Sequence, residues 1–319
     1  MMVALALLLG AGVLGWWAPR RLRALGLTGV DSAALLTAWA AAGLAVLAST
    51  TAAVWVLLVP SHAANDAAPS ALHGCWDALA HGTVPRAEQI AGLGAAAILG
   101  TLTLRVLLVF GSATVRRRRV RQRYLSSLRI AATRRPGDPR TWWLDHPHPV
   151  AFSLAGHPGV VVASNGLRDR LTDREVSAVL AHEYAHLRGR HHLLIAWFDA
   201  LAQALPFVPL FREAPQVVRG LAEQSADASA ARTSGPDVVC SALVAMAGTG
   251  FAAPGDGLAM AQGSVDGRID RLTRGYSGGG PVRRSVHVGT AAALVAMAPL
   301  VAAGLALSAL AVLSRPLSG

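Results

Sequence analysis

Long apolar stretches alternate with polar, arginine-rich stretches along this chain, and the apolar ones set its overall layout. A helix that crosses a bilayer core needs about 20 consecutive, mostly apolar residues. Four stretches are that long or nearly so: Met1–Ala18, Ala33–Val59, Ile90–Thr114 and Val286–Leu313. The pattern predicts a membrane domain with three transmembrane helices at residues 1–115, a polar domain at 116–284, and a fourth transmembrane helix with a short external tail at 285–319.

Within the polar domain, a helix is predicted from about Asp173 to Arg190. Thr172 and Glu175 have the spacing of a capping box, which marks the start of a helix. Apolar residues then recur on one helical face, at Val176, Val179, Leu180 and Leu187. Before this helix, two short apolar runs at 151–156 and 159–167 flank a glycine- and proline-containing turn and predict two strands. An exposed edge of these strands would suit an extended peptide, which can bind by adding a strand.

A further apolar stretch, Leu193–Phe211, follows the predicted helix and contains Asp199, Gln203, Pro206 and Pro209. A single crossing would carry the rest of the domain to the other side of the membrane, and the stretch is too short for a hairpin of two crossings. We therefore expect a helix that packs on the domain or lies in the membrane interface. The glycine-rich segment Gly248–Gly280 predicts a connector with a short helix near Leu258–Arg274.

Charge placement orients the predicted membrane helices. The net charge is +11, and arginines gather at 20–23, 116–135 and 268–284, whereas the loop Ser61–Ala87 contains one basic residue. Because basic residues gather on the cytoplasmic side, we expect the polar domain inside and this loop outside. The arginines after the third apolar stretch are expected to contact anionic headgroups of the lipid bilayer. No nucleic-acid-binding motif accompanies them, so no direct contact with nucleic acid is expected.

One charged residue, Arg105, falls inside the third apolar stretch. A charge buried within a membrane often marks a functional site. The alternative, which we favour, is that the side chain snorkels toward the cytoplasmic face.

The sequence His182-Glu183-Tyr184-Ala185-His186 lies in the predicted helix of the polar domain. Histidines four residues apart face one point beside a helix, where a Zn²⁺ ion can contact both rings. The glutamate between them lies next to the ion, where it can take a proton from the attacking water. With 11 histidines and five glutamates among 319 residues, chance would produce the pattern about 0.006 times per chain. The pattern therefore indicates a catalytic zinc site with Glu183 as the general base.

A catalytic zinc site needs a third protein ligand and an open position for water. Glu223 and Asp227 are four residues apart in a segment that Pro215 marks as a helix, so they share a face. We expect Glu223 to be the third ligand and Asp227 to accept the free ring N–H of a zinc-bound histidine. A solvated acidic stripe is the alternative, but glutamate is scarce, and three of the five stand at motif positions (Glu175, Glu183 and Glu223).

These motifs resemble those of the membrane gluzincin peptidases, in which His-Glu-x-x-His is followed by Glu-x-x-Ala-Asp. Two branches are similar: the HtpX-type and CAAX-prenyl proteases, and the BlaR/MecR-type antirepressor peptidases. The likeness covers Val150–Arg232 in detail. It implies that His182, His186 and Glu223 bind zinc and that Glu183 is the general base. Arg232, His157 and Arg268 are candidates for stabilising the transition state, and each also has a purely structural interpretation.

The predicted layout favours the antirepressor branch, whose members resemble it in having three spans, a cytoplasmic zinc domain and a fourth span. HtpX-type proteases usually place a membrane hairpin between the histidines and the third ligand, and the short stretch Leu193–Phe211 predicts no room for one. Only six residues follow the last apolar stretch, so we expect no external β-lactam sensor domain.

Together these features predict a mainly α multi-pass membrane protein with a cytoplasmic α+β zincin-like metallopeptidase domain. The expected function is zinc-dependent cleavage of a protein or peptide, with a BlaI-type transcriptional repressor as the first candidate substrate. Two alternatives stay open: an HtpX-type quality-control protease, and a nonenzymatic membrane scaffold with a structural zinc, which would leave Glu183 without a role. A homo-oligomer is compatible with the sequence.

Overall fold

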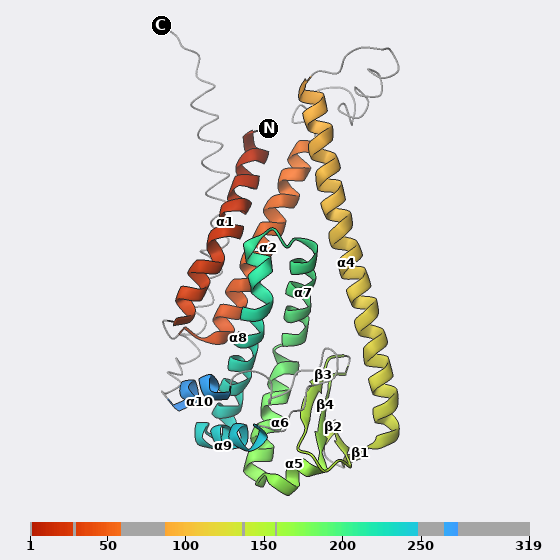
Figure 1. The fold of residues 1–319 in the computed structure, drawn as a ribbon, viewed down its shortest axis with the longest axis vertical. Coiled ribbons are helices and arrows are strands. Elements are labelled where there is room, and N and C mark those ends of the chain that lie inside the picture. Colours follow the sequence, from red (N-terminus) through yellow and green to blue (C-terminus); the bar gives the residue numbers. More distant parts are fainter. Residues whose placement is uncertain are drawn as a thin grey trace.

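The structure is a computed structural model that describes residues 2–27, 30–58, 87–135, 138–156, 158–247 and 265–273. It is mostly helical and contains one four-stranded sheet (Figure 1). The predicted combination of a mainly helical chain with an α+β part is therefore confirmed at this level.

Three long helices, α1 (Met2–Leu27), α2 (Ser32–Leu58) and α4 (Ala87–Ala131), extend along the longest axis of the molecule (Figure 1). Within the described residues, one segment, Ser32–Val54, is long and apolar enough to cross a membrane. The predicted external loop and the predicted fourth span lie outside the described residues, apart from Ala87. The helix α4 runs without a break through the predicted domain boundary at residue 115.

The stretch that was predicted to form one helix through Phe211 instead forms part of a helical hairpin. Its first arm, α7 (His191–Ala204), ends just before Pro206, and its second arm, α8 (Pro209–Ser234), begins with a proline. Proline cannot donate the hydrogen bond that a helix interior requires, but it suits a first turn, so the two prolines divide the apolar stretch. The second arm then continues far into the segment that carries Glu223.

The hairpin packs against α1 and α2 of the predicted membrane domain, whereas the sequence analysis expected a helix packed on the polar domain or lying in the interface. Phe198 and Phe211 are fully buried in one cluster with Trp39 of α2 and Ala18 of α1. At the tip of the hairpin, Val208 approaches Gly15 so closely that a Cβ at residue 15 would lie 3.0 Å from it. The tip of the hairpin thus lies beside the last turn of the apolar part of α1, just before the arginines at 20–23.

Arg105 has a specific partner at this tip. Its guanidinium Nη2 donates a hydrogen bond to the backbone carbonyl of Gln203, at 3.1 Å. The last carbonyls of a helix have no partner within the helix and carry partial negative charge, so a cation stabilises them. The side chain therefore joins α4 to the end of α7, a contact that the snorkelling interpretation did not include.

The sheet lies at the opposite end of the molecule from the N-terminus (Figure 1). Its strand order is β1-β2-β4-β3, with β2 and β4 parallel and the two other pairs antiparallel. The two predicted strands are present as β3 (Ala151–Leu154) and β4 (Val160–Ser164), after which the chain turns into a short helix, α5 (Asn165–Arg170). The strands β1 (Ala132–Arg135) and β2 (Asp138–Leu144) were not predicted, because their arginines interrupt the alternation of apolar and polar residues that marks a strand.

The predicted metal-binding helix is α6 (Asp173–Arg188), within two residues of the predicted end. Both hydrogen bonds of the capping box between Thr172 and Glu175 are present. Val176 and Val179 are buried in a core that α6 shares with the sheet, α8 and α9 (Pro236–Met246). The last helix of the described residues, α10 (Val265–Thr273), lies where a short helix was predicted and packs on α8 and α9.

Candidate metal centre

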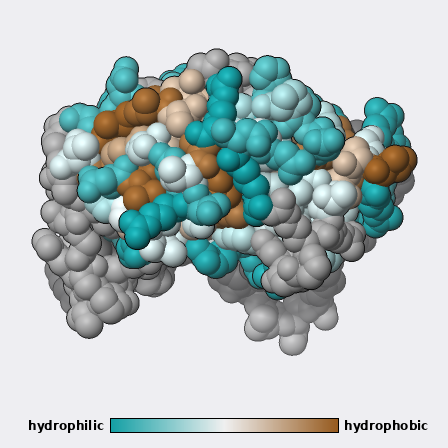
Figure 2. Space-filling view, turned by 90° about the horizontal axis from the view of Figure 1, so that it is seen from below, coloured by the Kyte–Doolittle hydropathy of each residue, from teal (hydrophilic) through white to brown (hydrophobic). Residues whose placement is uncertain are grey.

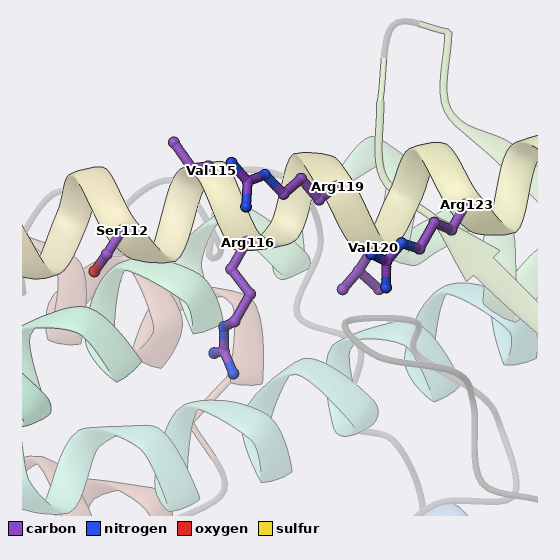
Figure 3. A pocket seen from close by; sticks show the side chains of 6 residues that line it. All are labelled: Ser112, Val115, Arg116, Arg119, Val120 and Arg123. Atoms are coloured by element: carbon purple, nitrogen blue, oxygen red, sulfur yellow. The ribbon is translucent and has the colours of Figure 1, made fainter.

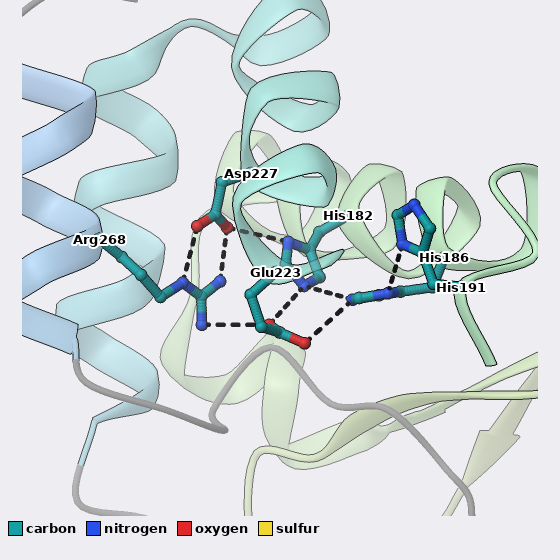
Figure 4. Close-up of polar contacts among 6 residues, drawn as sticks. All are labelled: His182, His186, His191, Glu223, Asp227 and Arg268. Atoms are coloured by element: carbon teal, nitrogen blue, oxygen red, sulfur yellow. Dashed lines mark hydrogen bonds and ion pairs between the residues drawn. The ribbon is translucent and has the colours of Figure 1, made fainter. Parts of the chain in front are cut away.

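Two helices that pack side by side, α6 and α8, place five predicted site residues in one cluster. The first three, His182, Glu183 and His186, lie on α6 and are fully buried. The other two, Glu223 and Asp227, lie on the facing side of α8 and are 9% and 3% exposed. Figure 4 shows that four of them, all except Glu183, converge on one region between the helices.

The donor groups of His182, His186 and Glu223 are close enough together to share one metal ion. The two histidine Nε2 atoms are 3.1 Å apart. The two oxygens of the Glu223 carboxylate face one ring each: Oε2 lies 3.5 Å from His182 Nε2, and Oε1 lies 3.4 Å from His186 Nε2. Donors at the usual Zn²⁺ distances of about 2.0–2.1 Å would be about 3.3 Å apart in a tetrahedral site. One ligand atom from each residue lies within 4.8 Å of the others. The residues present therefore fit a divalent metal with two nitrogen ligands and one oxygen ligand.

The electrostatics of the cluster favour a positive charge at the same place. Burial lowers the pKa of His182, but hydrogen bonds and charge interactions with Asp227 and Glu223 outweigh it and raise this pKa to about 9. Burial, together with the charge of His182, lowers the pKa of His186 well below its usual value, so this ring is neutral. A neutral imidazole beside two carboxylates is the donor set that a divalent cation needs.

The comparison with known families agrees with this geometry. Residues 115–252 match the model of Peptidase family M48. The match indicates a metallopeptidase, and it covers all five residues of the cluster. No solved structure matches the chain.

Within the matched residues, Asp227 contacts the ring nitrogen of His182 that faces away from the other donors. Its Oδ1 lies 3.0 Å from His182 Nδ1. If Nε2 binds a metal, the proton of the neutral ring must sit on Nδ1, the nitrogen that lies beside the Asp227 carboxylate. The arrangement is the one expected from the sequence for Asp227.

His191, which the sequence analysis did not select, contacts the second histidine of the His-Glu-x-x-His motif in a similar way. Its Nδ1 lies 3.0 Å from His186 Nδ1, and its ring is 5% exposed. Gly189 makes room for this ring, because a Cβ there would lie 2.3 Å from His191 Nε2. Arg190, with φ of 49°, turns the chain back so that His191 begins α7. A histidine five residues after His186 was the available sequence signal, but its contact depends on this left-handed turn.

The three candidates for stabilising the transition state have different positions. Arg232 is exposed in the last turn of α8, and no described contact links it to the cluster. His157 lies outside the described residues. Arg268 of α10, which lies beyond the M48 match, is 6% exposed and contacts both Asp227 and Glu223 (Figure 4).

Asp227 is held as a carboxylate by these neighbours. Burial raises its pKa, but hydrogen bonds from Arg268 and His182 outweigh it and lower the pKa to about 2. The ionised form can accept hydrogen bonds from both partners at once.

Proposed function

We propose that this protein is a membrane-bound, zinc-dependent endopeptidase with its active site on the cytoplasmic side. The observation that carries the proposal is the convergence of donor atoms from His182, His186 and Glu223, one from each lying within 4.8 Å of the others. Glu183, which lies between the two histidines in the sequence, is fully buried. Two histidines and one glutamate are a donor set of catalytic zinc sites in peptidases. A structural site would not need the buried Glu183, which argues against the scaffold hypothesis.

Within this proposal, each side chain has a defined part in hydrolysis. A bound zinc ion supplies a Lewis acid that polarises the scissile carbonyl and lowers the pKa of water toward ~7. Glu183 takes the proton from the attacking water and delivers it to the leaving amine. Asp227 and His191 hold the rings of His182 and His186 in orientation.

The edge of the sheet offers a place for the peptide. Among the described strands, β3 pairs with β4 alone, so its other edge has no strand partner. The β3 strand also packs against α6, which carries the histidines. An extended substrate bound along this edge would add a strand next to the metal-binding helix.

Placement in a membrane is supported by the surfaces of the long helices. Large hydrophobic side chains that are more than half exposed gather on α1 and α4: Leu5, Leu9, Val13, Trp16, Trp17, Ile98, Leu104, Leu107 and Leu108. Arg20 and Arg21 stack on Trp16 and Trp17 at the end of this apolar part of α1, as expected at a membrane interface. By contrast, hydrophilic residues cover much of the described surface at the sheet end (Figure 2).

The arginines of α4 support contact with anionic lipids. Arg116, Arg119 and Arg123 line a cleft of about 440 Å³, together with Ser112, Val115 and Val120 (Figure 3). No ion pair within the described residues neutralises these three arginines. The cleft follows directly after the exposed apolar part of α4, so headgroup phosphates at the cytoplasmic surface are suitable partners.

The proposed orientation predicts a labelling pattern. In a variant without Cys75 and Cys240, single cysteines within Ser61–Ala87 should react with an impermeant reagent added to intact cells. Cysteines between Arg116 and Arg284 should react only after permeabilisation, because three arginine clusters favour a cytoplasmic location. Labelling near Arg134 in intact cells would contradict the cytoplasmic placement and, with it, the repressor hypothesis.

For the substrate, two hypotheses compete. The predicted layout of three spans, a zinc domain and a fourth span favours cleavage of a cytoplasmic transcriptional repressor. The helical hairpin of α7 and α8 favours quality control of membrane proteins, because its turn lies between His186 and Glu223, where HtpX-type proteases place a membrane hairpin. The hairpin also packs on α1 and α2, which brings the chain around the active site close to the proposed bilayer.

Substrate breadth separates these hypotheses. Cells with the wild-type protein and cells with Glu183→Gln would be compared under envelope stress by proteomics of newly formed peptide termini. One dominant cut in a small DNA-binding protein is expected for the repressor hypothesis. Many cuts in membrane proteins, with no repressor among them, would reject it in favour of quality control. Equal termini in both strains would count against the peptidase proposal itself.

A further inference from the structure

Arg268 brings a buried positive charge to the metal centre from a helix that the M48 match does not include. Its Nε donates to Asp227 Oδ2 at 2.7 Å, and its Nη2 donates to Asp227 Oδ1. Its Nη1 lies 3.5 Å from Glu223 Oε2. Every nitrogen of the guanidinium therefore faces a carboxylate, as Figure 4 shows.

Arg268 thereby links Glu223, the proposed third metal ligand, to Asp227, which contacts His182. Asp227 Oδ1 is shared between His182 Nδ1 and Arg268 Nη2, while the same guanidinium faces the Glu223 carboxylate. A buried carboxylate is costly unless a cation and hydrogen bonds compensate it. The planar fork of arginine can satisfy two oxygens of one carboxylate and still reach a second group, which an ammonium cannot do in the same way.

We propose that Arg268 is a positioning residue of the metal centre, which holds Asp227 against His182 and turns Glu223 toward the two histidines. Through this residue, α10 becomes part of the metal-binding unit. The inference rests on the proposed function, since it takes His182, His186 and Glu223 as ligands. Arg268 acts through the carboxylates and does not contact the substrate, because its nitrogens are directed at Asp227 and Glu223.

Metal affinity of the full-length protein in nanodiscs tests the proposal, with zinc measured by competition against a chromogenic chelator. Arg268→Met should weaken zinc binding about 10–100-fold, the range for partners that orient metal ligands. Arg268→Lys keeps the charge but loses the two-point contact, so its affinity should lie between wild type and Arg268→Met. Arg271→Met is the matched control, since Arg271 is an exposed arginine of the same helix, and it should bind zinc like wild type.

A double-variant cycle separates positioning from general stabilisation. If Arg268 acts through Asp227, then Arg268→Met combined with Asp227→Asn should lose little more affinity than the weaker-binding single variant. Fully additive losses would overturn the proposal. If Arg268→Met does not fold, as judged by circular dichroism, the cycle is run with Arg268→Lys.

The outcomes also separate this inference from the proposed function. If wild type binds no zinc, the proposed function fails. If wild type binds zinc and Glu223→Gln loses it, but Arg268→Met binds as tightly as wild type, the positioning proposal alone fails. A fall in kcat for Arg268→Met without any change in zinc affinity would indicate that Arg268 stabilises the transition state. This result would also overturn the positioning proposal.

Discussion

Glu183→Gln is expected to abolish most peptidase activity while leaving the metal bound. The amide has nearly the same shape as the carboxylate, but it cannot take a proton from water or return one to the leaving amine. Loss of a positioned general base typically costs about 10²–10⁴-fold in rate. Cleavage of a quenched fluorescent peptide library, together with elemental analysis of the purified protein, would measure both properties.

A matched control uses a glutamate of the same protein away from the cluster. Glu213 is on α8, ten residues before Glu223, and its carboxylate pairs with Arg23 at 2.7 Å. Glu213→Gln should keep both zinc and activity, because an ion pair at a partly exposed position contributes little. Wild-type activity in Glu183→Gln would rule out this residue as the base.

Loss of any one of the three metal ligands is expected to have the largest effect on metal content. His182→Ala, His186→Ala and Glu223→Gln should each weaken zinc binding by more than about 100-fold, beyond the effect of residues that only orient ligands. The reason is that each alanine removes a nitrogen ligand, whereas Glu223→Gln replaces an anionic oxygen ligand with a neutral and weaker one, at a site where one donor atom from each residue lies within 4.8 Å of the others. Zinc content after dialysis against a weak chelator would measure the loss.

Glu223→Gln is the most informative of these variants. It keeps the size of the side chain, so its fold should be retained better than that of the two alanine variants, which leave a cavity at a fully buried position. Asp227→Asn serves as the comparison, with an expected loss of about 10–100-fold. Full zinc retention in Glu223→Gln would remove Glu223 from the ligand set.

The local patterns of the sequence were sufficient for the elements that carry the site. The capping box at Thr172 and the apolar face of Val176 and Val179 predicted α6 within two residues of its observed end. The four-residue spacing of His182 and His186, and of Glu223 and Asp227, places each pair on one helical face. These are properties of a single helix, so they can be read without knowing the tertiary structure.

Only the tertiary structure decided how these elements meet. Pro206 and Pro209 divide an apolar stretch into a hairpin, and its second arm, α8, returns Glu223 to the histidines. The contacts of His191 and Arg268 also depend on tertiary structure, since one requires the left-handed turn at Arg190 and the other the docking of α10. Arg105 likewise finds its partner 98 residues away. Helical periodicity records which residues share a face, whereas the partner of that face is set by packing between segments distant in the chain.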